Sequence, residues 1–269
     1  MHIRALSLIA ASLWLCCTPL MAAEAAPPDA ATLAALAPTG VLRAAINLGN
    51  SVLAQQDAAG ELHGVSVDLA RALGRSLGVP VRLVVYHEAG ATFAGGQKGE
   101  WDVAFLAIDP QRAEQVDFTA PYVVIDGAYM VWADSAFKTS EDLDRDGVRI
   151  AAPKGSAYEL YLTRTLKHAS LVRTDTVAGA PQSFADQHLE AVAGIGAALR
   201  RVANTHPEWR VITPGFQTIR QALVTPKGRA PQGLTYLSAF VERMKASGFV
   251  RQALDNTGQV DADVAPPAN

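Results

Sequence analysis

Apolar and polar residues alternate in the first half of the chain as they do in strands and amphipathic helices. Three short apolar runs, at residues 41–47, 81–86 and 101–106, predict buried strands. Residues 66–77 repeat leucine at helical spacing and stop before Gly78, and residues 90–98 form a second, glycine-broken helical stretch. Strands that alternate with helices predict an α/β lobe with a mostly parallel sheet.

The second half of the chain repeats this alternation. Strands are predicted at residues 148–152, 189–193 and 209–213, and helices at residues 156–168, 181–188 and 197–204. The apolar runs 122–133 and 219–225 are suited to lead out of the first lobe and back into it. Two amphipathic helices, at residues 234–246 and 249–256, close the chain. The pattern therefore predicts a second α/β lobe inserted into the first.

Both ends of the chain fall outside this alternation. Arg4, an apolar run over residues 5–15 and the small-x-small sequence Ala23-Glu24-Ala25 predict a cleaved signal peptide over residues 1–25. Residues 26–38, rich in alanine and proline, are interpreted as a leader. Residues 259–269 are polar and contain proline, so we expect a disordered tail.

Composition narrows the classes of protein. Cys16 and Cys17 both lie in the predicted signal peptide, so the mature chain has no disulfide and no thiolate chemistry. A net charge of −3 gives no basic field for nucleic acid or an anionic membrane, and we expect an exported soluble protein. The histidines lack metal-ligand spacing, and no nucleophile elbow, phosphate loop or metalloprotease motif occurs, so neither a cofactor nor a metal is expected.

Several motifs, in order, resemble family 3 solute-binding proteins of ABC importers, the polar amino-acid-binding group. They are GELHGVSVDLARALGRSLGV (residues 60–79), KGEWDVAF (98–105), DPQRAEQVDFTAPY (109–122) and DGVRIAAPKGSAYE (146–159). The resemblance covers nearly all of the mature chain. It implies a type II periplasmic binding protein fold, with two α/β lobes, two hinge strands and a ligand cleft between the lobes.

The resemblance also sets expectations for organisation and function. It implies a first lobe made of residues 38–128 and 222–258, and a second lobe made of residues 129–221. The protein is then a periplasmic monomer, not an enzyme, that captures a small carboxylate-bearing solute, either an amino acid or a non-amino organic acid. Closure around the solute would precede docking on the membrane permease of an ABC transporter.

Arg112 matches the arginine that holds the ligand carboxylate in this family. A guanidinium binds a carboxylate through two parallel hydrogen bonds and keeps its charge at every physiological pH. The alternative for Arg112 is a structural ion pair with Glu114 or Asp117. Asp109 is expected to cap a short helix.

Gly155 and Ser156 match the family's glycine and first threonine at a helix start, where free amides can receive an anion. Residues 156–159 also read as a capping box, and both roles can hold together.

The departures from the family suggest an unusual ligand. Family members place hydroxyl groups, an acid and aromatic rings at positions where this chain has Ala107, Phe105, Ile195, Asn50 and Val65. A buried ammonium group without an acidic partner is costly. We therefore hypothesise a ligand that has a carboxylate but no α-ammonium group, with Asn47, Asn50 and Gln55 supplying neutral hydrogen bonds.

Two other functions remain open. Some proteins of this fold are dehydratases that act on cyclic carboxylates, and Glu190 or Glu88 would be the proton donor in such an enzyme. A periplasmic sensor that presents its closed form to a membrane receptor is the other alternative.

Overall fold

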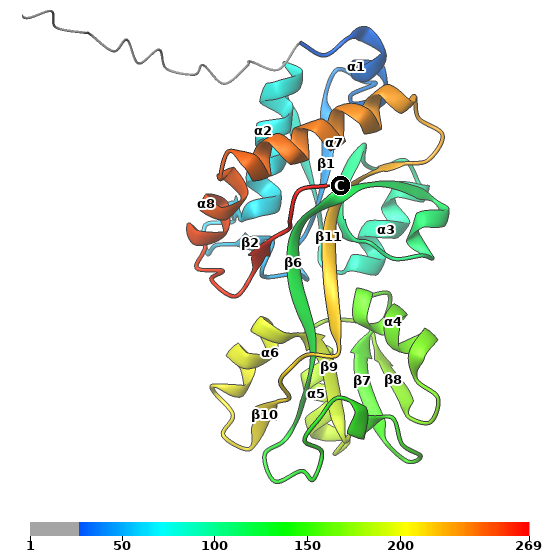
Figure 1. The fold of residues 1–269 in the computed structure, drawn as a ribbon, viewed down its shortest axis with the longest axis vertical. Coiled ribbons are helices and arrows are strands. Elements are labelled where there is room, and N and C mark those ends of the chain that lie inside the picture. Colours follow the sequence, from blue (N-terminus) through cyan, green and yellow to red (C-terminus); the bar gives the residue numbers. More distant parts are fainter. Residues whose placement is uncertain (1–26, 269) are drawn as a thin grey trace, which may run out of the picture.

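The protein, described here by a computed structural model of residues 27–268, consists of two α/β lobes joined by two long strands (Figure 1). These strands are β6 (Val116–Trp132) and β11 (Gln217–Pro226), which pair antiparallel along most of their length. The predicted class, a two-lobed α/β fold with two hinge strands, is confirmed. The predicted signal peptide, residues 1–25, lies outside the described residues.

The upper lobe is built on a three-stranded parallel core in the order β4-β1-β5, to which β11 adds antiparallel. The strands are β1 (Leu42–Asn47), β4 (Val81–Tyr86) and β5 (Val103–Ala107), with a small hairpin of β2 (Gln55–Gln56) and β3 (Leu62–His63). The described helices of this lobe are α1 (Ala30–Leu36), α2 (Val65–Leu77), α3 (Ala89–Gln97), α7 (Pro231–Ala246) and α8 (Phe249–Asp255) (Figure 1).

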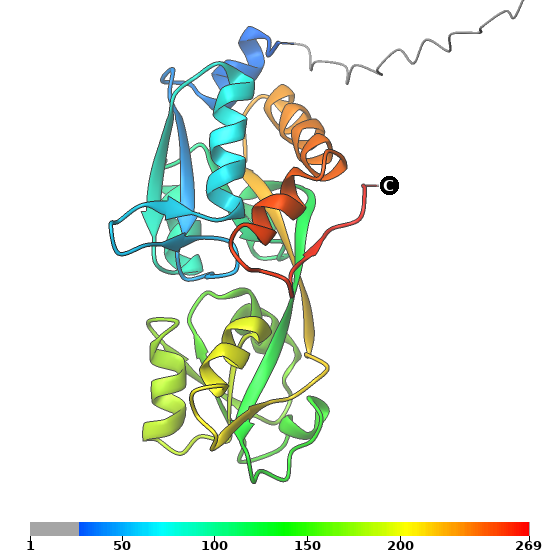
Figure 2. The same ribbon diagram turned by 90° about the vertical axis from the view of Figure 1, so that its left-hand side faces the viewer.

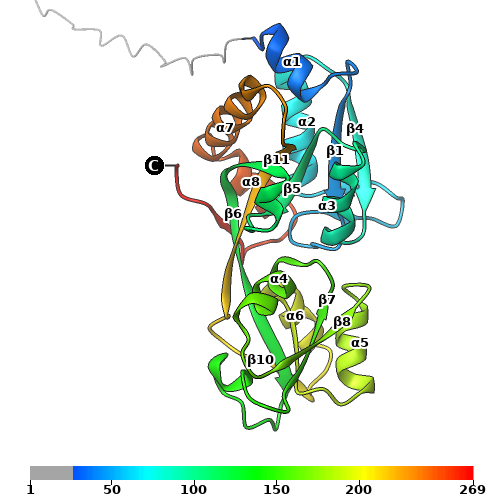
Figure 3. The same cartoon turned by 90° about the vertical axis from the view of Figure 1, so that its right-hand side faces the viewer.

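The lower lobe repeats the plan with a parallel core in the order β9-β7-β8, to which β6 adds antiparallel. Its strands are β7 (Arg149–Pro153), β8 (Ser170–Thr174), β9 (Ala191–Ile195) and β10 (Trp209–Val211). Its helices are α4 (Ala157–Thr165), α5 (Gly179–Asp186) and α6 (Gly196–Ala203), seen with the sheet in Figure 3. Within residues 27–268, no helix combines the length and the apolarity needed to cross a bilayer.

Helix α2 shows why the apolar pattern predicts the lobes well. Leu69 and Leu73 point into the core and are fully buried. Gly78 ends the helix in the left-handed region at φ 69°, where a glycine has no Cβ to clash, and its amide bonds back to the last turn. The predicted helix, residues 66–77, differs from the observed one by a single residue.

The segment interpreted as a leader instead contains helix α1. Asp29 caps the helix by accepting a hydrogen bond from the Thr32 amide at 2.7 Å. Leu36 is fully buried, and Gly233 of α7 lets that helix approach closely, because a Cβ at Gly233 would lie 2.8 Å from the Cβ of Ala35. The Ala- and Pro-rich composition hid this short packed helix.

The C-terminal segment, predicted to be disordered, is ordered against the upper lobe and the hinge (Figure 2). Its strand β12 (Asp263–Val264) pairs antiparallel with β6. Arg251 donates to the carbonyls of Gln259 and Ala262, and Lys245 donates to the carbonyl of Pro266. The segment is polar, but it pairs with the backbone of β6, and these two side chains donate to its carbonyl groups. Composition alone does not predict such contacts with distant residues.

Deletion of residues 259–269 is expected to destabilise the protein. The deletion exposes part of β6 and removes the carbonyls of this segment to which Arg251 and Lys245 donate. A loss of about 2–4 kcal/mol in the free energy of unfolding follows from several hydrogen bonds of about 1 kcal/mol each. Thermal denaturation of the truncated and full chains measures it, and an unchanged Tm would contradict the structural role of this segment.

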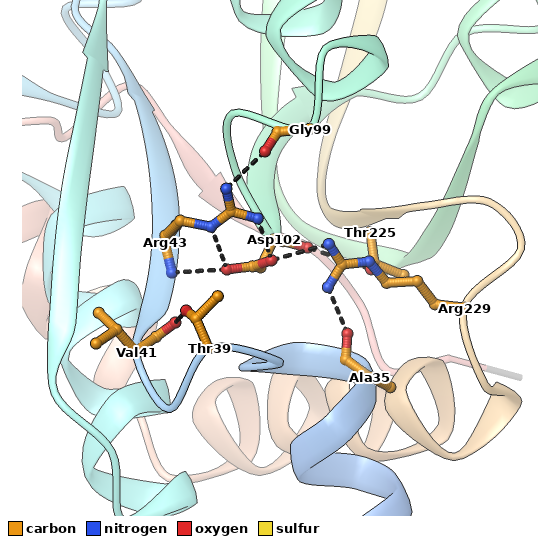
Figure 4. Close-up of polar contacts among 8 residues, drawn as sticks. All are labelled: Ala35, Thr39, Val41, Arg43, Gly99, Asp102, Thr225 and Arg229. Carbon is orange, nitrogen blue, oxygen red and sulfur yellow. Dashed lines mark hydrogen bonds and ion pairs between the residues drawn. The ribbon is translucent and has the colours of Figure 1, made fainter.

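A buried ion-pair cluster fixes the base of the upper lobe (Figure 4). The Asp102 carboxylate, with 0 % of its side chain exposed, accepts hydrogen bonds from the backbone amide and the guanidinium of Arg43. Arg229 donates to the same carboxylate at 2.8 Å and also to the carbonyl of Ala35 in α1. Asp102 therefore links β1, the start of β5, the segment after β11, and α1.

Candidate functional site

A pocket of about 40 Å³ lies between the lobes, at the ends of β1 and β5 in the upper lobe and at the start of α4 in the lower lobe. We call it the head pocket. Residues of both lobes line it. Those used below are Asn47, Asn50, Glu88, Phe105, Ala107, Arg112, Ser156, Ala157, Tyr158 and Ile195. The site therefore forms only where the two lobes meet.

Arg112 is buried at the wall of the head pocket, with 2 % of its surface exposed. It lies in the short 3₁₀ helix η1 (Arg112–Glu114), which follows β5. Its guanidinium donates to the carbonyl of Ala107 at 3.1 Å and, across the cleft, to the carbonyl of Gly155 at 2.8 Å. Among the described residues it forms no ion pair with Glu114 or Asp117, so the structural alternative for Arg112 is not observed.

Burial makes Arg112 a receptor for an anion. Loss of solvent lowers the pKa of Arg112 to about 10, although the nearby charge of Asp109 raises it, and the group stays protonated at neutral pH. Arg112 bonds only to neutral carbonyls, and the nearby Asp109 carboxylate is paired with Arg164, so among the described residues this buried guanidinium has no directly bonded countercharge. An anionic group of a ligand in the head pocket would supply that countercharge.

The start of α4 faces the same pocket. Ser156 caps the helix by accepting a hydrogen bond from the Glu159 amide at 3.1 Å, and the Glu159 carboxylate accepts from the Gly155 amide. This is the predicted capping box, except that the Glu159 carboxylate accepts from the amide of Gly155 and not from the amide of Ser156. The first-turn amides of Ala157 and Tyr158 have no partner within an α-helix, and both residues line the pocket.

The structure brings most of the predicted residues together. Asn47, Asn50, Phe105 and Ala107 line the head pocket, and Gly155 reaches it through its carbonyl bond with Arg112. Ile195 also lines the pocket, as expected of a position near the family's acid.

Val65 and Gln55 are not part of the pocket lining. Val65 is fully buried in the upper-lobe core as the first residue of α2, where its side chain packs rather than faces a ligand. The Gln55 side chain donates to the Ser51 carbonyl in the β2 hairpin segment. The side-chain oxygens of Asn47 and Asn50 accept hydrogen bonds from the amides of Gly49 and Val52, respectively. These bonds stabilise the loop after β1.

Glu88 was considered from the sequence only as a proton donor of the enzyme alternative, and its place in the ligand pocket was not predicted. It follows β4, lines the head pocket and accepts a hydrogen bond across the cleft from the Val177 amide at 3.1 Å. Desolvation raises the pKa of Glu88 above its usual value. The expectation of a pocket without an acid is therefore wrong: the acid comes from the upper lobe rather than from the position of Ile195.

The lobes are closed on each other. Asp109 accepts from the Gln111 amide in the turn before η1, but the N-cap position of η1 is Gln111 and not Asp109 as predicted. Asp109 also pairs with Arg164 of α4 at 2.8 Å. Arg201 of α6 donates to the Ser51 hydroxyl at 2.8 Å. Two glycines permit the approach, because a Cβ at Gly155 would lie 2.9 Å from the Cα of Gly90.

Glu190 does not belong to the cleft. Burial would raise the pKa of Glu190, but hydrogen bonds from Arg149 outweigh it and hold the pKa below its usual value. An ionised, paired carboxylate of this kind is unsuited to donate a proton. Across residues 27–268, no group of three histidine, cysteine or acidic side chains is placed to hold a metal ion.

Comparison with known proteins identifies the class. Residues 42–257 match the family of bacterial extracellular solute-binding proteins, family 3, and because the match spans most of the chain, the protein belongs to that family. The resemblance seen in its motifs is thereby confirmed.

Individual relatives are distant. The chain is 25% identical over 155 residues to the ABC transporter arginine-binding protein 1 of Escherichia coli K12, a match that covers 57% of this chain and 62% of that protein. The solute receptor for L-cysteine of Neisseria gonorrhoeae is similar in structure, with a TM-score of 0.73, 24% identity, and coverage of 85% of this chain and 94% of the receptor.

A third relative bears on the enzyme alternative. It is the ancestral amino acid-binding protein AncCDT-1, described as a precursor of cyclohexadienyl dehydratase, with a TM-score of 0.71 and 24% identity over 84% of this chain and 99% of that protein. At this identity the two structural relatives show a shared fold.

Proposed function

We propose that this protein is the periplasmic substrate-binding component of an ABC importer and that it captures an amino acid between its lobes. One observation carries the proposal: the buried Arg112 guanidinium faces an interlobe pocket and has no acidic partner among the described residues. The family of the chain and the binding proteins to which it is similar support the same role. The membrane permease of the importer would receive the closed, loaded form.

The solute carboxylate would bind to Arg112 and to the free amides at the start of α4. The guanidinium belongs to the upper lobe and the amides belong to the lower lobe, so one carboxylate bridges the two. Such a bridge makes the closed form more stable when the solute is bound, since a ligand shifts a conformational equilibrium only through contacts that differ between the states. The hinge strands β6 and β11 would bend during closure.

Glu88 changes the expected solute. The hypothesis of a ligand without an α-ammonium group rested on the lack of an acid near Ile195. Because Glu88 lines the same pocket as Arg112, the site has one group for a carboxylate and one for an ammonium. We therefore favour an α-amino acid over a non-amino organic acid.

Glu88→Gln is expected to weaken binding of an amino acid at least tenfold. Its affinity for the corresponding carboxylic acid without the amino group should stay within about threefold of the wild-type value. Removing one partner of a buried charge pair costs about 2–5 kcal/mol, whereas a neutral amide keeps the shape of the site. Amino-acid affinity of the wild type should also fall as the pH drops through the raised pKa of Glu88. Isothermal titration with leucine and with 4-methylpentanoate measures both effects.

Glu114→Gln, on the exposed surface of η1, is the control for this variant. Unchanged leucine affinity in Glu88→Gln, together with tight binding of 4-methylpentanoate, would return the site to non-amino acids. Turnover of a prephenate-like substrate by the purified protein would instead indicate the dehydratase activity, with Glu88 as the proton donor. Capture of a membrane receptor rather than a permease would indicate the sensor.

A further inference from the structure

A second and much larger pocket joins the head pocket between the lobes. It has a volume of about 440 Å³, against about 40 Å³ for the head pocket. The two share five lining residues, Gly49, Glu88, Tyr158, Val177 and Ile195. The two pockets therefore adjoin, and they make up a narrow and a wide part of the space between the lobes.

The wide part extends into the lower lobe and is lined by residues of α5, α6 and β9. These three elements are labelled in Figure 1. We call it the α5–α6 crevice and define it by Ala178, Ala180, Gly194, Ala198, Leu199 and Val202. Short side chains on the two helices leave this space open. Its floor is the lower-lobe core, because Ala180, Val192 and Leu199 belong to one buried cluster.

The chemistry of the crevice differs from that of the head pocket. Among the described residues that line it there is no lysine or arginine, and the one acid, Glu88, lines both parts. Its other polar residues, Ser51, His87 and Thr176, lie on the loops at its mouth rather than on α5, α6 or β9. Pockets of a few hundred Å³ that are apolar, with few polar groups, are typical of sites for small organic molecules at domain boundaries.

The sizes of the two parts limit what the head pocket can hold. A water molecule needs about 10–15 Å³ on this measure, so the head pocket has room for only a few non-hydrogen atoms. A carboxylate and the carbon that bears it fill such a space. The rest of a larger solute would extend past Glu88 and Tyr158, which line both parts, into the crevice.

We infer that the crevice binds the apolar side chain of the solute, so that the protein selects amino acids with a large aliphatic or aromatic side chain. The inference rests on the proposed function, since the head group must first be held at Arg112 and Glu88. Burial of a leucine- or phenylalanine-sized group contributes affinity by the hydrophobic effect, on the order of a 10- to 100-fold gain. A charged side chain would meet no countercharge in the crevice.

Titration of the wild type and two crevice variants with glycine, leucine and phenylalanine tests the inference. The wild type is expected to bind leucine or phenylalanine at least tenfold more tightly than glycine. Ala198→Phe fills the crevice from α6. It is expected to lower the affinity for leucine and phenylalanine at least tenfold and to keep the affinity for glycine within about threefold of the wild-type value. Ala178→Trp, at an exposed position before α5, fills the mouth and keeps the test valid if Ala198→Phe does not fold.

Ala239→Phe, exposed on α7 of the upper lobe and outside the crevice, is the matched control and should behave as the wild type. Equal affinity of the wild type for glycine and leucine, or crevice variants that keep full leucine affinity, would overturn the inference. If Arg112→Ala still abolishes binding in that case, the proposed function stands without it. Binding of no amino acid by the wild type would overturn both.

Discussion

Arg112→Ala is expected to reduce solute affinity by a factor of about 30 or more. The variant removes the guanidinium that receives the carboxylate and also the hydrogen bond to Gly155 across the cleft. Loss of one partner of a buried, charge-assisted pair costs about 2–5 kcal/mol, equivalent to a factor of about 30 to several thousand. Isothermal titration with the amino acid that binds the wild type most tightly measures the loss.

Two further variants separate binding of the carboxylate from closure of the lobes. Arg112→Lys keeps the charge but not the planar fork, so it should recover only part of the affinity. Arg201→Ala also removes an arginine contact between the lobes, to the Ser51 hydroxyl, but Arg201 does not line the head pocket. Its effect should stay within about threefold, and an equally large loss in Arg201→Ala would mean that Arg112 acts through closure alone.

Asp102→Ala is expected to lower the free energy of unfolding by about 3–5 kcal/mol. The change leaves two largely buried guanidinium groups, those of Arg43 and Arg229, without their common countercharge. Asp102 links β1 and the start of β5 to the segment after β11 and, through Arg229, to α1 (Figure 4). Denaturant titration of the variant measures the loss. Asp255→Ala breaks an exposed pair with Arg251 and serves as the control, with a change within about 1 kcal/mol.

The same carboxylate gives the upper lobe a defined acid sensitivity. Burial alone would raise the pKa of Asp102, but hydrogen bonds from Arg43 and Arg229 outweigh it and hold the pKa below its usual value. The unfolded chain has a pKa of about 3.9, so this stabilisation is complete above about pH 4. The stabilisation is lost as the pH falls through the lower pKa that Asp102 has in the folded protein. The Asp102→Ala variant should lack this part of the acid dependence, and an unchanged dependence would contradict it.

The sequence predicts those elements of the fold whose pattern is local. Helix α2 is recognisable because Leu69 and Leu73 share a face and Gly78 ends it. Strand β8 was not predicted, because Ser170–Thr174 has only two aliphatic residues and pairs with β7 through its backbone. Helix α1 and strand β12 depend on partners about 200 and 140 residues away, at Gly233 and Val124.

The residues of the site likewise divide into those that a local motif predicts and those that only the folded structure brings together. Arg112 and Ser156 were found because each stands in a motif that resembles the family's. Glu88 was named only as a proton donor of the enzyme alternative and not as a ligand-binding residue, because its place in the pocket depends on closure of the lobes and on Val177, 89 positions further along the chain. The α5–α6 crevice has no motif at all. It arises because short residues on two separate helices, such as Ala180 and Ala198, leave space opposite the cleft.

A thermal-shift comparison of leucine with leucinamide tests the central claim most directly, which is that the cleft closes on a carboxylate. Leucinamide keeps the ammonium and the apolar side chain but lacks the carboxylate that Arg112 is proposed to hold. With bound solute first removed, leucine at a hundredfold excess over its Kd should stabilise the protein by about 2.7 kcal/mol, a rise of several degrees in Tm. The account predicts this rise with leucine and none with leucinamide at the same concentration. Equal stabilisation by leucinamide would contradict it.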